Sequence, residues 1–123
     1  DDMPLTRRAL IACAAAIVAT PLSAHHGWRW TDDGAFELTG VITKAEMGNP
    51  HGLLTVDAAG ELWTAEVGQP WRNESAGLTD NMLVPGVELT LQGHRSANPD
   101  ERVMKAERVI IAGKRYDLYP DRS

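Results

Sequence analysis

The sequence predicts a small all-β barrel domain, and three observations support this fold class. Short segments alternate apolar and polar residues, turns rich in glycine and proline separate them, and one helical segment interrupts their order. Three strands, a short helix and then two or three more strands is the order of an OB-fold barrel with five to six strands. The 123 residues suffice for one such domain. A small β-sandwich is the alternative, since the number of strands does not distinguish the two architectures.

The first half of the barrel is predicted from three alternating segments. Phe36–Lys44 alternates apolar and polar side chains, and Gly40 in its middle indicates a bulge or a sharp bend. Asn49-Pro50 marks a turn, after which His51–Val56 forms the second expected strand. A hairpin loop then leads into the third expected strand, Glu61–Val67.

The second half begins with a helix. Pro70–Gly77 has proline near its start and glycine at its end, the pattern of a short helix, and Thr79–Leu83 allows one more helical turn. Val87–His94 and Val103–Ile111 are the fourth and fifth expected strands, and Arg115–Leu118 adds a short sixth.

Residues 1–24 have the three parts of a secretory signal peptide. The basic pair Arg7-Arg8 precedes an apolar run over Ala9–Ala19, and the small residues Ser23-Ala24 offer a cleavage site. The paired arginines leave open export by the twin-arginine route. The apolar run is shorter than the roughly 20 residues of a transmembrane helix, so we expect no stable membrane span unless the leader is retained. We therefore expect a periplasmic domain over residues 25–123.

Charge and cysteine content narrow the possible functions. The net charge is −5 and no lysine or arginine cluster is present, which argues against nucleic acid as a partner. The single cysteine, Cys13, lies in the leader, so the domain has no disulfide and no thiolate ligand. Histidine and carboxylate remain as strong metal ligands, with the thioether of Met47 as a soft auxiliary.

A candidate metal site lies where the leader meets the domain. Cleavage after Ala24 makes His25 the N-terminal residue, with its α-amino group and its ring nitrogen available to chelate one ion. His26 adds a second imidazole, and His51 projects from the extended backbone that follows Asn49-Pro50. Nitrogen donors in this number favour copper, with zinc second.

Other polar residues receive more ordinary interpretations. Glu66 is expected to be a solvated strand carboxylate, although it could accept a hydrogen bond from a ligand imidazole. His94 is expected at the surface and Trp63 in the core. Because no serine, cysteine or carboxylate set for catalysis is recognisable, we expect a binding protein rather than an enzyme.

The chain resembles the DUF6152 family of small exported bacterial proteins. The matching residues run from His25 to about Leu118: His25-His26-Gly27-Trp28, Leu38-Thr39-Gly40-Val41, Asn49-Pro50-His51, Trp63, Glu66, Leu83-Val84-Pro85-Gly86 and Gly93. Met47 departs from the pattern, because members often have an aromatic residue at that position. The resemblance implies export and a small β-barrel, and it brings no established activity.

Two hypotheses for function follow. The first is an exported periplasmic protein that carries or delivers copper through His25, His26 and His51. The second is a non-enzymatic module that docks on a periplasmic protein or a polymer through the groove of its barrel, without metal.

Overall fold

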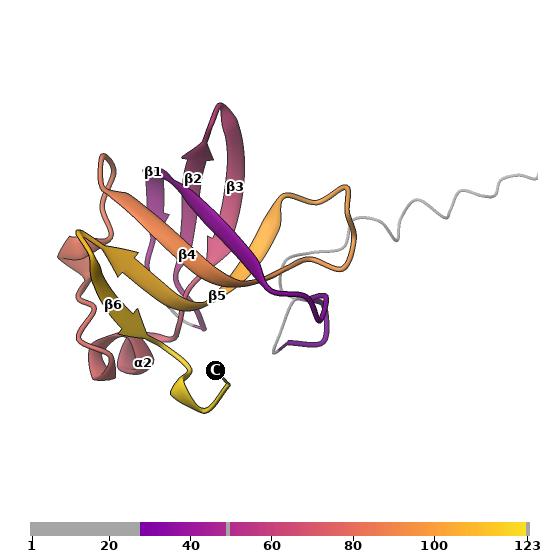
Figure 1. The fold of residues 1–123 in the computed structure, drawn as a ribbon. Helices are drawn as coiled ribbons and strands as arrows, with labels where there is room; N and C mark the ends of the chain where they lie inside the picture. The colour runs from indigo at the N-terminus through magenta and orange to yellow at the C-terminus, as the bar shows by residue number, and fades with distance from the viewer. Residues whose placement is uncertain (1–27, 49, 123) are drawn as a thin grey trace, which may run out of the picture. The chain divides into compact units, whose positions relative to one another are not determined.

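The structure is a computed structural model that describes residues 28–48 and 50–122 (Figure 1). The chain divides into two units, residues 1–30 and residues 31–123. In the first unit, residues 28–30 form a turn. The remainder of this section concerns the second unit.

Six strands form one mixed sheet that closes on itself. They are β1 (Phe36–Glu46), β2 (Leu53–Ala58), β3 (Glu61–Glu66), β4 (Glu88–Arg95), β5 (Val103–Ile111) and β6 (Lys114–Asp117). Their order is β3-β2-β1-β4-β5-β6, and a parallel pairing between β3 and β5 closes a barrel of five strands to which β6 adds an edge. The predicted OB-fold-like barrel is confirmed.

Short helices connect and end the barrel. Helix α2 (Pro70–Ser75) and the 3₁₀ turn η3 (Asp80–Met82) connect β3 to β4, and the 3₁₀ turn η4 (Pro120–Arg122) follows β6. The short helix between the third and fourth strands was predicted. It ends earlier than Gly77, whose φ of 89° lies in the left-handed region where glycine commonly follows a helix. No helix in the described part of the chain is long and apolar enough to cross a membrane.

Two glycines permit close contact between strands. A Cβ on Gly40 would lie 2.4 Å from the carbonyl oxygen of Asp57, and one on Gly93 would lie 2.0 Å from that of Lys105. The bulge expected at Gly40 is instead a register shift between Ile42 and Lys44 in the pairing of β1 with β2. Gly40 is therefore required by the closeness of the neighbouring strand.

The barrel interior is filled by apolar side chains from every strand. The fully buried ones are Ile42, Leu54, Val56, Ala65, Leu91, Met104, Ala106 and Val109, and Trp63 is also in the core, as predicted. Since side chains alternate across a strand, the residues between these positions face outward. On β3 and β5 several of these outward residues are polar and nevertheless buried.

Candidate functional site

His51 is paired with a buried carboxylate. It lies two residues before β2, and its Nδ1 is 3.3 Å from Oε2 of Glu66, the last residue of β3. The Glu66 residue is only 6% exposed. The expectation of a solvated Glu66 was therefore wrong, and the structure brings Glu66 together with one of the three predicted ligands.

Lys105 completes this pair from the neighbouring strand. Glu66 and Lys105 are directly paired in the parallel β3–β5 ladder, and the Lys105 Nζ is 2.9 Å from Glu66 Oε2. Lys105 is 1% exposed. A lysine buried to this degree needs an anionic partner, and the Glu66 carboxylate beside His51 is in position to serve as that partner.

Residues after β6 cover this ion pair. The Lys105 Nζ lies 5.7 Å from the ring centre of Tyr119, and the Arg72 guanidinium of α2 stacks 4.2 Å from the same ring. Burial raises the pKa of Tyr119 and the Glu66 charge adds to the rise, while the positive charges of Arg72 and Arg122 oppose it. Glu66 and Lys105 are buried because the chain after β6 returns over the outside of the barrel.

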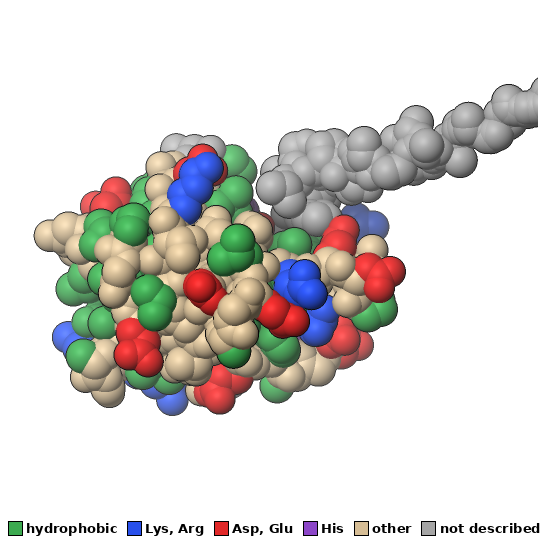
Figure 2. Space-filling view, turned by 90° about the horizontal axis from the view of Figure 1, so that it is seen from above, with side chains coloured by type: hydrophobic (Ala, Val, Ile, Leu, Met, Phe, Trp, Pro, Cys, Tyr) green, Lys and Arg blue, Asp and Glu red, His purple; other side chains and the backbone are tan. Residues whose placement is uncertain are grey.

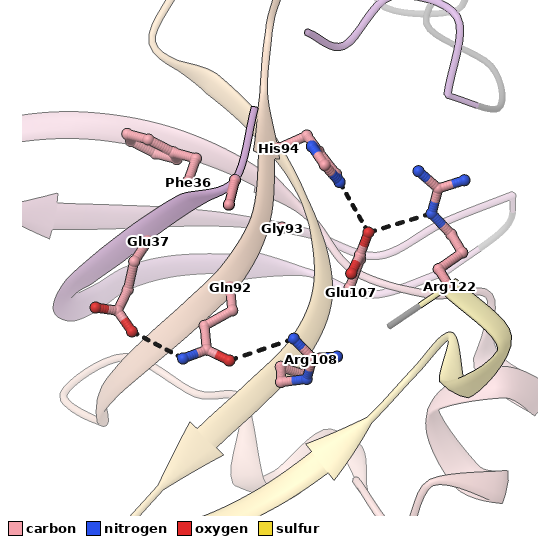
Figure 3. A pocket seen from close by; sticks show the side chains of 9 residues that line it. Phe36, Glu37, Gln92, Gly93, His94, Glu107, Arg108 and Arg122 are labelled. Atoms are coloured by element: carbon pink, nitrogen blue, oxygen red, sulfur yellow. Dashed lines mark hydrogen bonds and ion pairs between the residues drawn. The ribbon is translucent and has the colours of Figure 1, made fainter. Parts of the chain in front are cut away.

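A second buried carboxylate lies further along β5. Glu107 Oε2 is 2.8 Å from His94 Nε2 and 3.2 Å from Arg122 Nε (Figure 3). These side chains line a pocket of about 450 Å³ together with Phe36 and other residues of β1, β4 and β5. His94 was expected at the surface, but its side chain is only 16% exposed because Glu107 and the carbonyl of Gly34 hold it against the barrel.

The other predicted site residues are placed as follows. His25 and His26 lie outside the described residues. Met47 packs against the hydrophobic core, and its methyl group lies close to Gly52, which follows His51. Within residues 28–48 and 50–122, no three histidine, cysteine, aspartate or glutamate residues form a group that could hold a metal ion. Of the predicted ligands, the described structure therefore places His51 alone.

The surface carries charges of both signs. On the face shown in Figure 2, lysine and arginine side chains lie among aspartate and glutamate side chains, with apolar side chains scattered between them. An extended basic stripe of the kind that follows a nucleic-acid backbone is not seen on that face.

The family model of DUF6152, a family of unknown function, matches residues 12–104. The small OB-like barrel with its buried His51–Glu66–Lys105 cluster is therefore a member of that family. No curated protein matches the sequence.

Solved structures show a similar fold at low sequence identity. The S. pombe Stn1–Ten1 complex matches with 16% identity over 65% of this chain and 59% of that chain, at a TM-score of 0.52. A TiaS mutant without its ZRD, in complex with agmatine, matches with 13% identity over 68% of this chain and 26% of that one, at a TM-score of 0.49. The chain thus spans about a quarter to three fifths of these structures, and the likeness concerns the fold alone.

Proposed function

We propose that the protein is an exported periplasmic metal carrier that binds copper, with zinc second, through His25, His26 and His51. In this proposal residues 1–24 are a cleaved signal peptide, and the amine and ring of His25 chelate the ion. The role is carriage or delivery to a periplasmic partner. The observation that carries the proposal is the contact between His51 Nδ1 and the buried Glu66 carboxylate.

This contact supports metal binding because it orients an imidazole. Ligand histidines commonly donate one ring N–H to a carboxylate, and this fixes the tautomer and makes the other nitrogen a better donor. With Nδ1 directed to Glu66, His51 would bind a metal through Nε2. Copper would add a Lewis-acidic and redox-active centre, while the protein side chains hold and orient it.

Lys105 supports the same role from behind the carboxylate. Its ammonium is 2.9 Å from Glu66 Oε2, and it therefore supplies the counter-charge behind the carboxylate that faces His51. The partly buried Tyr119 ring lies over Lys105 on this side of the cluster. His51 is thereby held by charges that do not depend on a metal being present.

The test is a Cu(II) titration of the protein that begins at His25, with its N-terminus verified by intact mass. We expect binding that His51→Ala and His25→Ala weaken strongly. Glu66→Gln should weaken it roughly 10- to 100-fold, the usual effect of removing such a supporting carboxylate. Glu61→Gln, at the exposed start of β3, is the matched control and should bind as the parent does. Unchanged affinity in both histidine variants would refute the site.

A second function has an observation of its own. Val41 and Leu62 are 40% and 57% exposed, and both pair with Asp57 of β2, so they flank this aspartate in one row across the outer face of β1, β2 and β3. Two exposed apolar side chains on one outer face suit a module that docks on a protein or polymer without metal. If the protein is such a module, Leu62→Ser should abolish partner binding, and a chelator should leave partner binding of the parent protein unchanged. The Cu(II) titration should then show no binding.

A further inference from the structure

A bulge in β5 directs Glu107 toward β4 and the end of the chain. Gly93 pairs with Ala106 while Gln92 pairs with Arg108, so Glu107 is the extra residue. Its backbone carbonyl accepts hydrogen bonds from the N–H groups of Leu118 and Tyr119. Its Oε2 contacts both His94 and Arg122 (Figure 3). One residue thus joins β4 to the segment after β6.

His94 makes two short contacts that require two protons. Its Nε2 is 2.8 Å from Glu107 Oε2, and its Nδ1 is 2.8 Å from the Gly34 carbonyl oxygen. A carbonyl and an ionised carboxylate only accept hydrogen bonds, whereas a neutral imidazole has one N–H. If the imidazole ring were flipped, two ring carbon atoms would occupy the positions of the nitrogens. Each carbon would then lie about 2.8 Å from an oxygen, closer than the 3.3–3.6 Å typical of C–H···O contacts. The pair therefore holds one proton more than a neutral histidine and a carboxylate.

The contacts of Glu107 assign this proton to His94. Arg122 Nε donates a hydrogen bond to the same Oε2 at 3.2 Å, so this oxygen is an acceptor toward Arg122 as well as His94. Among the charged groups nearby, Arg108 pairs with Asp117, Lys105 pairs with Glu66, and Glu37 bonds to Gln92. Glu107 is the carboxylate in direct contact with His94.

We propose that Gly34, His94, Glu107 and Arg122 form a proton-dependent clamp. With His94 doubly protonated, the clamp ties the segment before β1 to the β5 bulge and to η4. Loss of the proton removes one of these two hydrogen bonds of His94 and loosens that segment, to which the Thr31–Ser96 bridge and the bond from the Asp32 N–H to the Arg95 carbonyl also belong. The proposal stands on these contacts and does not require a metal at His51.

The first test is the protonation state of His94, read from the ¹⁵N shifts of its ring in the labelled full chain at pH 7. We expect both nitrogens to carry hydrogen. In Glu107→Gln the amide can donate to Nε2, so the same ring should become a neutral imidazole protonated at Nδ1 alone. One unprotonated ring nitrogen in the parent protein would overturn the proposal, and this holds even if Glu107→Gln does not fold.

The second test is the pH dependence of the segment before β1. After correction for intrinsic exchange, the Asp32 amide should exchange roughly tenfold faster or more once His94 has lost its proton, since a hydrogen bond to a charged group is broken. His51→Gln is the matched control and should keep this dependence, while Glu107→Gln should abolish it. Protection of Asp32 that is independent of the His94 proton would contradict the clamp.

Discussion

At the scale of the residue, the position of Lys105 shows how a charge is retained inside a small protein. Its ammonium reaches Glu66 across one rung of the β3–β5 ladder, and the Tyr119 ring covers it. Burying an ion pair costs desolvation, so the pair adds little net stability. Removing one member, however, leaves the other charge buried without its counterion.

This asymmetry gives a prediction for Lys105→Met. We expect the free energy of unfolding to fall by about 3–5 kcal/mol, because Glu66 keeps its burial and loses its cation. Urea denaturation followed by circular dichroism measures the change. Adding Glu66→Leu to Lys105→Met should recover part of the loss.

The matched control for Lys105 is Lys44, which pairs with Glu46 at a solvent-exposed position on β1. Lys44→Met should change stability by at most about 1 kcal/mol. Equal losses in the two methionine variants would show that the Lys105 pair behaves as an ordinary surface contact.

At the scale of the element, the strands followed from the sequence because alternation and turns are local properties. Phe36, Glu61 and Val103 were each correctly predicted to begin a strand. The second strand begins at Leu53 rather than His51, where the Gly52 N–H instead bonds to the Gly68 carbonyl. A hydrogen bond between residues distant in sequence leaves no recognisable pattern in the sequence around either residue.

The candidate site was predictable only in part for the same reason. His51 could be singled out from Asn49-Pro50, and its partner Glu66 lies on the outward side of β3 as alternation predicts. Outward residues are usually solvated, so the burial of Glu66 and His94 could not be inferred. The burial of Glu66 arises from residues 118–122, which fold back over the barrel, and the low exposure of His94 arises from its contacts with Glu107 and the Gly34 carbonyl. Lys105 and Glu107 were missed because alternating charges in a strand also describe an ordinary exposed face.

Strand packing also gives a prediction for Gly93→Ala. The added Cβ would overlap the Lys105 carbonyl oxygen of β5, and backbone there cannot move without opening the β4–β5 pairing. We expect a loss of roughly 3 kcal/mol or more in the free energy of unfolding, or a failure to fold. Gly48→Ala, where the added Cβ meets no atom within 4 Å, should be close to neutral in the same denaturation assay.

At the scale of the whole molecule, one surface carboxylate connects stability to pH. The hydrogen bond from Arg108 is the main cause that lowers the pKa of Asp117, and Arg115 contributes further while burial opposes it. Since the folded-state pKa lies below the unfolded value, the contribution of Asp117 is present above the unfolded pKa. It is lost as the pH falls through the folded pKa.

We therefore expect Asp117→Asn to reduce the loss of stability on acidification from pH 5 to the acid transition. Thermal or urea unfolding over a series of pH values measures this slope. The effect should be small because Asp117 is partly exposed and water screens it. Asp33→Asn, an exposed position before β1, is the control and should leave the slope unchanged.

The return of residues 118–122 over β5 has a consequence for how the molecule forms. The chain is synthesised from its N-terminus, yet the cover over Lys105 and the partner of Glu107 come from Tyr119 and Arg122. Strand β1 must likewise await β4, about 50 residues later, and pairings so distant in sequence slow folding to the millisecond-to-second range. Glu66 therefore acquires its native surroundings only after Tyr119 has left the ribosome, and Glu107 only after Arg122 has done so. The barrel is thus expected to complete its folding only after residues 119–122 have been synthesised, as one late event.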